Sequence, residues 1–395
     1  MKLRDENKKS RKLPVPAIIL LDLMLIAAGM SIFLLFYYVI PQNYNTQDTQ
    51  VVAATTDTAS TFALPTDTTT TDTLTSTANT TETDSTTTDS SMVDSSTDTT
   101  ASVITTDTSD SATTSATSGT TNRTKGQNTG NTGTTQIAAD TSAGSEIASE
   151  DIVTTLLNSY SSDNMQITIN KNVMGTGSDT VTYYVADIYV TSVDYLLSAF
   201  ANDTYGKNIK DTISGMATDN NAILAVNGDF YGDSEEGTVI RNGVVYRTDV
   251  VDADVCVLFT DGTMKTYSPE DFDADTVIAQ GAWQAWTFGP ALLDGSGNVL
   301  TTFNTTDYIN GENPRTAIGY VSPGHYVLVV VDGRDEGYSR GVTISELAAI
   351  MAEEGCQTAY NLDGGKSSAM VFEGEYINQP ADGGREVSDI IYLAE

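Results

Sequence analysis

A long stretch of low complexity divides this chain and limits where a folded core can form. From about residue 42 to residue 148 the sequence consists mainly of Thr, Ser, Asp, Ala and Asn, with few aromatic residues. Such a composition buries too little apolar surface to offset the entropy of the chain. We therefore expect residues 41–144 to be a disordered linker, either O-glycosylated or an unmodified acidic tether. This linker would carry a folded domain away from a membrane.

An apolar run precedes this linker. Residues 15–40 are nearly all apolar apart from Asp22 and Ser31, and about 20 such residues span the hydrocarbon core of a bilayer as a helix. Basic residues in the segment 1–14 predict that this tail is cytoplasmic. A cleaved signal peptide is the alternative, but the run is longer than a usual signal-peptide core and no clear cleavage site follows it. The sequence thus predicts a single-pass protein of the cell membrane, with its C-terminal domain outside the cell.

Composition excludes several classes of function. The formal charge is −34 and the basic residues cluster only at the N-terminus, so nucleic acid is not an expected partner. Cys256 and Cys356 are the only cysteines, which excludes a four-thiolate metal site. Nothing in the sequence brings their Cα atoms close enough for a disulfide, so we do not favour one. His325 is the only histidine, and we expect it to be exposed in a turn.

Residues 145–395 have the pattern of one β-rich domain. Between Ile147 and Tyr160, apolar residues recur near every 3.6 positions and predict an amphipathic helix. Later segments alternate and are separated by turn signals, such as Asn242-Gly243, which favours a two-residue hairpin. The expected strands are 166–170, 181–190, 223–227, the hairpin 239–247, 255–259, 264–267, 316–321, 326–331 and 358–362.

One helix interrupts the strands. Thr343 and Glu346 fit a capping box, an apolar stripe follows, and Gly355 stands where a helix often ends. These signals predict a helix over residues 344–354. We therefore expect an α+β domain with few helices.

Four of the expected strands are flanked by polar and glycine residues, as binding sites at strand ends require. Asp363 ends a strand and precedes two glycines and two serines, a segment suited to binding an anionic oxygen. An ordinary Asp-Gly-Gly turn is the alternative. Arg315 begins another strand, and arginine binds phosphate in a bidentate manner. The candidate substrate- or phosphate-binding residues are Asn227, Arg315, Thr316, Asp332, Arg334, Gly364, Gly365, Lys366, Ser367, Ser368 and Arg385.

Two of these assignments have alternatives. Asp332 and Arg334 either contact substrate or form an ion pair with each other that fixes a strand end. The acidic loop at 233–236 could bind Ca²⁺ through oxygen ligands, although a solvated charge run is the more common outcome. We therefore leave the metal content open, with Ca²⁺ as the candidate ion.

Six segments resemble, in order, the motifs of the phosphodiester glycosidase family. They are NGDFY at 227–231, FGP at 288–290, PRTAIG at 314–319, DGR at 332–334, NLDGG at 361–365 followed by two serines, and REVS at 385–388. The resemblance implies an α+β fold around a mixed sheet. It also implies hydrolysis of the bond between an anomeric carbon and a phosphodiester oxygen. Two positions depart from the family pattern: Lys366 replaces a glycine and Ala369 replaces a threonine.

The chemistry implied by this resemblance assigns roles to the candidates. A phosphate leaving group needs charge stabilisation more than a strong acid, and Arg315 with the loop 364–368 would supply it. A carboxylate must act as nucleophile or as base for water; Asp363 is the first choice and Asp229 the second. The expected substrate is a glycan phosphodiester in an envelope glycopolymer or exopolysaccharide. A non-catalytic polysaccharide-binding module and a phosphoglycosyl transferase are the alternatives.

Overall fold

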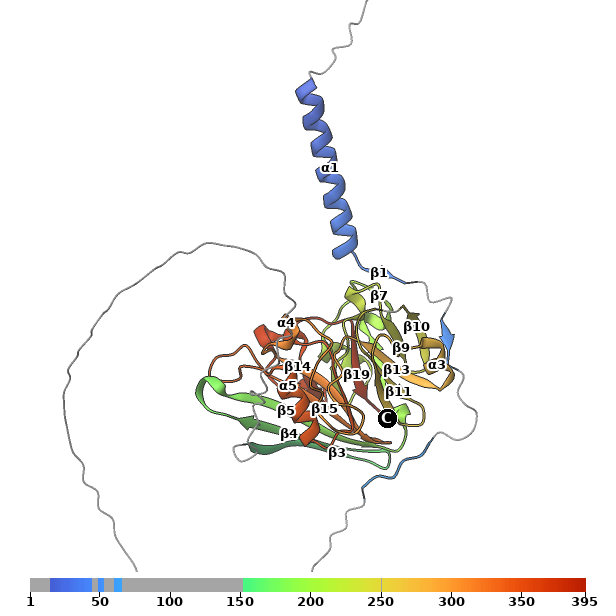
Figure 1. Cartoon of the computed structure of the whole chain (residues 1–395), viewed down its shortest axis with the longest axis vertical. Coiled ribbons are helices and arrows are strands. Elements are labelled where there is room, and N and C mark those ends of the chain that lie inside the picture. The colour runs from blue at the N-terminus through green and yellow to red at the C-terminus, as the bar shows by residue number, and fades with distance from the viewer. Residues whose placement is uncertain (1–14, 45–48, 53–59, 66–151, 250) are drawn as a thin grey trace, which may run out of the picture. The chain divides into compact units, whose positions relative to one another are not determined.

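The computed structural model describes residues 15–44, 49–52, 60–65, 152–249 and 251–395 (Figure 1). Its first element is α1 (Val15–Tyr38), and the part Ile19–Tyr38 is long and apolar enough to cross a membrane. A signal sequence near an N-terminus passes the same test of length and composition. The expected tail, 1–14, lies outside the described residues.

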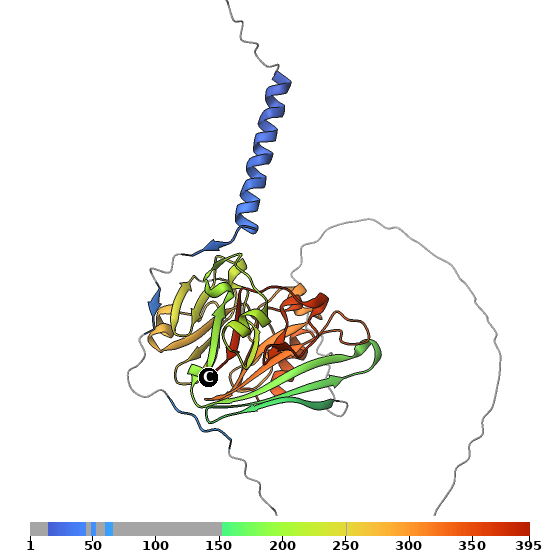
Figure 2. The same ribbon diagram turned by 180° about the vertical axis from the view of Figure 1, so that it is seen from behind.

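Three large antiparallel sheets and a two-stranded sheet, β1-β7, account for the strands of the described residues (Figures 1 and 2). The first has the order β16-β14-β15-β5-β4-β3, the second β12-β11-β13-β9-β10-β2, and the third β18-β17-β8-β19-β6. All strand pairs between the described residues are antiparallel, so the expectation of a mixed sheet is wrong. Hairpin turns join neighbouring strands such as β14 and β15, which fixes an antiparallel direction.

The strand bounds follow most of the expected segments. The first sheet consists of β3 (Val153–Ser161), β4 (Met165–Met174), β5 (Val181–Val190), β14 (Arg315–Ser322), β15 (His325–Val331) and β16 (Thr358–Asn361). The second consists of β2 (Gln50–Val51), β9 (Thr238–Arg241), β10 (Val244–Thr248), β11 (Val255–Phe259), β12 (Met264–Tyr267) and β13 (Ala282–Thr287). The third consists of β6 (Leu196–Phe200), β8 (Leu224–Asn227), β17 (Met370–Phe372), β18 (Glu375–Tyr376) and β19 (Asp389–Leu393).

Four short helices accompany the sheets in the described domain: α2 (Ile213–Asp219), α3 (Ala274–Ala279), α4 (Asp307–Asn310) and α5 (Ile344–Glu353). The helix predicted over 344–354 is confirmed as α5, and both hydrogen bonds of its capping box are formed between Thr343 and Glu346. The prediction of a mostly β domain with few helices is likewise confirmed.

The helix predicted between Ile147 and Tyr160 is wrong. From Val153 the chain forms β3, which pairs with β4 at the edge of the first sheet, while residues 147–151 lie outside the described part. Val153 and Leu156 are 65% and 62% exposed, so their spacing does not mark a face that packs on a core. Backbone pairing with β4 decides the conformation instead.

The apolar core lies where the three sheets pack on one another. Its largest cluster combines Ile188 of β5, Leu258 of β11 and Ile391 of β19. A second cluster places α5 against β14 and β15 of the first sheet. Cys256 and Cys356 are both buried and free, so they form no disulfide.

Three pieces of the expected linker contact the folded domain. β1 (Gln42–Asn43) pairs with β7 (Gly206–Lys207), and β2 pairs with β10. Further along, the N–H of Phe62 donates to the carbonyl of Thr191 at 2.8 Å, and its ring packs against the core. These contacts differ from the expected linker, whose remaining part from residue 66 lies outside the described residues.

Candidate functional site

The strand ends that carry the candidate residues meet at one edge of the fold. Arg315, the first residue of β14, lies opposite Val331, the last residue of β15. On its other side β14 pairs with β16, whose last residue, Asn361, precedes Asp363 by two positions. The hydroxyl of Thr316 donates to Oδ1 of Asn227 at 2.7 Å, which joins this edge to the end of β8. The sheet register therefore brings together four of the predicted segments.

A pocket of about 280 Å³ opens at this edge. Among its lining residues are seven of the predicted candidates: Arg315, Arg334, Asp363, Gly364, Gly365, Lys366 and Arg385. The other candidates do not line it: Asn227, Asp229, Thr316, Asp332, Ser367 and Ser368. Sequence reasoning missed Phe288 of the FGP segment and Tyr308 of α4, which also line the pocket.

Asp363 is buried and held in a fixed orientation. Its Oδ2 accepts hydrogen bonds from the Ser367 hydroxyl at 2.5 Å and from Nη2 of Arg385 at 2.6 Å. The side-chain amide of Asn227 donates to the backbone carbonyl of Asp363 at 2.7 Å. Burial raises the pKa of the carboxyl, while Arg385 and Ser367 act in the opposite direction. Asn227 and Ser367 are thus positioning residues for this carboxylate.

Arg315 brings a positive charge to the pocket without a carboxylate partner. Its guanidinium donates to the backbone carbonyls of Val342, Ile309 and Gly311. Burial and the neighbouring Arg334 lower its pKa to about 10. Backbone carbonyls therefore hold the guanidinium of Arg315 in place. Among the described residues, no carboxylate forms an ion pair that would neutralise its charge.

Arg334 places a second positive charge beside it. Its Nη2 donates to Oδ1 of Asn313 at 2.7 Å and to the Tyr308 hydroxyl at 3.1 Å. A Cβ built on Gly365 would meet this guanidinium at 3.2 Å, and Gly365 has a φ of +67°. Glycine is therefore needed at position 365 for both its conformation and its closeness to Arg334.

The expected alternative for Asp332, an ion pair with Arg334, is not formed. The Asp332 carboxylate accepts instead from the hydroxyl of Tyr338, the amide of Asn378 and the N–H of Gln379. Burial raises its pKa. Among the residues that the structure describes, neither Arg315 nor Arg334 forms an ion pair within 4.0 Å.

The loop 364–368 differs from the expected anion cradle. The N–H of Gly365 donates to Pro314, and those of Ser367 and Ser368 donate to Gly364 and Gly365 within a 3₁₀ turn. These three donors are used inside the protein. Lys366 lines the pocket, and its Nζ lies 2.8 Å from an Asp382 oxygen. The loop thus shapes the wall of the pocket and contributes two side chains to the site. Lys366 lines the pocket, and the hydroxyl of Ser367 orients Asp363.

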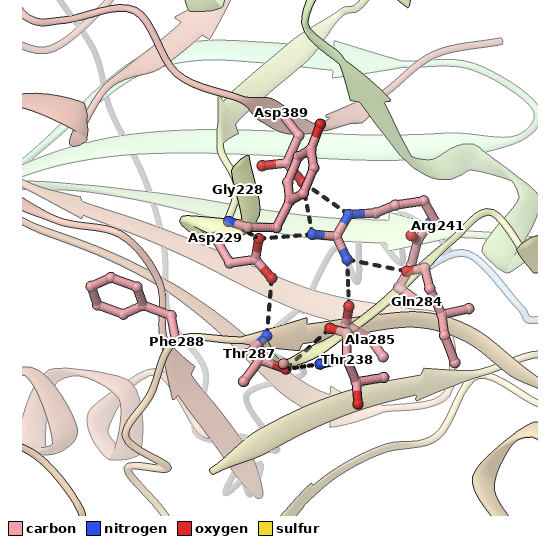
Figure 3. Close-up of polar contacts among 12 residues, drawn as sticks. Gly228, Asp229, Thr238, Arg241, Gln284, Ala285, Thr287, Phe288 and Asp389 are labelled. Carbon is pink, nitrogen blue, oxygen red and sulfur yellow. Dashed lines mark hydrogen bonds and ion pairs between the residues drawn. The ribbon is translucent and has the colours of Figure 1, made fainter. Parts of the chain in front are cut away.

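Asp229, the second choice for the catalytic carboxylate, belongs to a buried cluster (Figure 3). Its Oδ1 accepts from Nη2 of Arg241 at 2.9 Å, and its Oδ2 accepts from the N–H of Thr287 at 2.9 Å. Nη2 of Arg241 also lies 2.8 Å from Oδ2 of Asp389. Both oxygens of Asp229 therefore have partners within the protein, and Asp229 lines a small cavity together with Asp363 and Arg385.

Two carboxylates share one guanidinium in this cluster. Arg241 and Asp389 are 2% and 0% exposed, and burial raises the pKa of Asp389 to about 7 although Arg241 lowers it. A proton on one carboxyl would leave the cluster without net charge. Sequence reasoning missed both residues; the signal for Arg241 was a charged residue inside an otherwise apolar strand.

The candidate Ca²⁺ loop is occupied by ion pairs. Asp233 pairs with Lys210, and Glu235 pairs with Lys207, each at 2.8 Å. Within the described ranges, no group of three or more His, Cys, Asp or Glu side chains is arranged to hold a metal ion.

The predicted exposure of His325 is wrong. The side chain is 17% exposed, its Nε2 lies 2.6 Å from Oδ1 of Asp187, and its ring stacks on Tyr189. Residue 325 begins β15 instead of lying in the turn before it, so the paired neighbours of the strand cover the ring.

Comparison with known proteins confirms the resemblance found in the motifs. Residues 220–394 match the family model for phosphodiester glycosidase. A SPbeta prophage-derived uncharacterized protein, YomE, of Bacillus subtilis is 31% identical over 254 residues, which cover 59% of this chain and 39% of that protein. The N-acetylglucosamine-1-phosphodiester alpha-N-acetylglucosaminidase of Bos taurus is 36% identical over 75 residues, or 19% of this chain and 14% of that enzyme. The chain thus matches less than half the length of either relative.

Among solved structures, the zebrafish N-acetylglucosamine-1-phosphodiester alpha-N-acetylglucosaminidase catalytic domain, auto-inhibited by its pro-peptide, is similar with a TM-score of 0.49 and 19% identity. The match covers 62% of this chain and 88% of that one. A hypothetical protein from Synechocystis is similar with a TM-score of 0.40 and 14% identity, covering 59% of this chain and 62% of that one.

Proposed function

Because residues 220–394 match the phosphodiester glycosidases, we propose that this chain hydrolyses the bond between a sugar's anomeric carbon and a phosphodiester oxygen. The enzyme would be anchored by α1 and act outside the cell on a glycan phosphodiester of an envelope glycopolymer or exopolysaccharide. One observation carries the proposal: Arg315 and Arg334 line the same pocket as the buried carboxylate Asp363, and neither arginine has a carboxylate partner among the described residues.

The two arginines support a phosphate site in this pocket. Arg315 is buried and Arg334 is exposed. A buried guanidinium such as that of Arg315 is unfavourable without a counter-ion because it gives up hydration. A phosphodiester anion would restore that balance and accept hydrogen bonds from the forked donors of arginine. Charge that develops on the leaving phosphate would be stabilised by the same groups. Arg315 and Arg334 are therefore assigned to the phosphate.

Asp363 supplies the carboxylate for the sugar side of the reaction. The bond from the anomeric carbon to the phosphate oxygen breaks, and its electron pair stays on the phosphate. Water finally delivers a hydroxyl to the anomeric carbon and a proton to the products, either directly with Asp363 as base or after Asp363 has acted as nucleophile. Arg385 and Ser367 hold the carboxylate in place for either role.

The test is an assay of the full chain in detergent against methyl phosphodiesters of several sugar 1-phosphates. We expect release of reducing sugar in equal amounts with methyl phosphate. Arg334→Gln should lower kcat/KM by about tenfold or more, since a charge-assisted hydrogen bond to phosphate is lost. Binding without any sugar release would overturn the hydrolase in favour of a binding module. Transfer of the sugar 1-phosphate to an added alcohol, with release of methanol and without free sugar, would favour the phosphoglycosyl transferase.

A further inference from the structure

The end of the apolar helix contacts the folded domain directly. Only three residues separate the last residue of α1, Tyr38, from Gln42, the first residue paired in β1. The side-chain amide of Asn208 donates to the carbonyls of Tyr37 and Ile40 at 3.1 and 3.3 Å. Nζ of Lys207 lies 3.2 Å from the centre of the Tyr37 ring. The segment 207–208 therefore lies at the point where the chain leaves the helix.

Three cavities near this point and the candidate site share lining residues, and the middle one holds only about 10 Å³. A cavity of about 430 Å³ is lined by Pro41 together with Lys210 and Glu386. Lys210 and Glu386 also line a small cavity with Asp363 and Arg385, and the latter two line the main pocket. Figure 1 shows β7 and α4 at the same end of the domain, and Tyr308 and Ile309 of α4 line the main pocket. Residues of the site thus lie near residues that line the cavity at Pro41.

The low-complexity segment does not set the distance between helix and domain. The chain is tied to the domain at β1, again at β2, and a third time at Phe62 and Pro65, whose carbonyl accepts from the Gln166 side chain at 3.2 Å. The densest part of the Thr/Ser-rich sequence, from Thr66 onward, follows these contacts along the chain. The spacing is therefore fixed by residues 39–41, which span at most roughly 15 Å from Tyr38 to Gln42 when fully extended.

We propose that the site acts on a sugar joined through its 1-phosphate to a lipid alcohol in the same membrane. This proposal rests on the reaction of the proposed function and names a lipid-linked sugar as its substrate in place of an envelope polymer. The lipid phosphate would lie against Arg315 and Arg334, and its lipid alcohol would leave the pocket toward the end of the domain where β1 pairs with β7. The bond from the anomeric carbon to the phosphate oxygen breaks, water adds a hydroxyl to the sugar, and a lipid phosphate monoester remains in the bilayer. A polymer chain far from the membrane would reach a pocket so placed less readily.

The test compares two substrates that share one sugar: its polyprenyl phosphodiester in phosphatidylcholine vesicles, and its water-soluble methyl phosphodiester. The full chain is reconstituted into the vesicles. One variant carries about 15 inserted Gly and Ser residues between Ile40 and Pro41, which frees the domain from the bilayer surface. The matched control carries the same insertion after Thr100, where the three ties to the domain stay as they are.

We expect the insertion at residue 40 to lower the ratio of lipid-linked to soluble turnover by about tenfold, because the effective concentration at the surface falls with tether length. The insertion after Thr100 should leave the ratio unchanged. An unchanged ratio in the first variant overturns the inference, even if both rates fall together. A wild-type chain that cleaves the methyl ester but not the lipid-linked sugar overturns the inference alone. A chain that cleaves neither substrate overturns the proposed function as well.

Discussion

Asp363 is the residue at which the proposed chemistry can be tested most directly. Asp363→Asn keeps the size of the side chain and its acceptor toward Ser367 or Arg385, but it removes the negative charge. We expect kcat to fall by about 10²–10⁴-fold, with KM and the melting temperature little changed, because the lost interaction belongs to the transition state. A variant that melts earlier yet turns over normally per folded molecule would show that Asp363 only shapes the turn.

Arg385 sets the pH range in which Asp363 is ionised. Burial raises the pKa of Asp363, and the charge of Arg385 lowers it. The carboxylate must be ionised to act as base or nucleophile, so activity is lost as pH falls through this pKa. Arg385→Gln removes the lowering effect, and we expect the acid limb of the kcat/KM profile to move to higher pH. A limb that stays in place or moves to lower pH would contradict the pairing of Asp363 with Arg385 in solution.

The residues of the site could be predicted from sequence to different degrees. Asp363 and Arg315 were found because each stands at the end of a strand, where side chains reach a pocket. The roles of Ser367 and Asn227 could not be found, since a hydroxyl or amide can contact substrate or protein equally well. Only the three-dimensional contacts show that both bind Asp363. Arg241 escaped notice because its partners lie up to 148 positions away in the chain.

At the scale of elements, the Arg241 cluster ties β9 to β19 and to the end of β8. Burial raises the pKa of Asp389 to about 7, while an unfolded Asp titrates near 4. Between these values the folded chain binds more protons, so the free energy of unfolding falls as pH rises. We expect Asp389→Asn to remove this contribution.

The measurement for this prediction is the melting temperature from pH 4.5 to 7.5. We expect the melting temperature of wild type to fall relative to that of Asp389→Asn as pH rises. The variant can still have the lower melting temperature at every pH. Asp382→Asn, at an exposed position, is the matched control. A difference that does not vary with pH would mean that Asp389 stays ionised beside Arg241.

Local sequence signals predicted helices and turns correctly where neighbouring residues alone determine the conformation. The capping box before α5 and the Asn242-Gly243 turn each specify their element through neighbouring residues. The apolar spacing before Tyr160 failed because β3 is decided by pairing with β4. Hairpins fix the antiparallel direction of neighbouring strands, but the pairings of β5 with β15 and of β14 with β16 join distant segments. The mixed sheet implied by the family resemblance was therefore wrong.

At the scale of the whole molecule, composition separated the apolar helix, the Thr/Ser-rich segment and the domain. Composition did not show that β1, β2 and the Phe62 ring belong to the domain. Segments of two residues are too short to show the alternation of apolar and polar residues that predicts a strand. Val52 is only 5% exposed. The described residues between 42 and 65 therefore contact the domain, which the expected spacer would not do. The substrate inference rests on this difference.

The last prediction concerns which part of the chain the fold needs. Starting from residues 41–395, replacing residues 68–143 by a flexible Gly/Ser linker should leave the melting temperature within about 2 °C, because the unit formed by the flanking residues keeps its contacts. A chain that starts at Ser145 loses β1, β2 and the burial of Val52 and Phe62. It should still fold, but we expect it to melt about 2–8 °C lower. Equal melting temperatures for the chains starting at residues 41 and 145 would show that these contacts add no stability. The inference that residues 39–41 hold the domain close to the helix would then be contradicted.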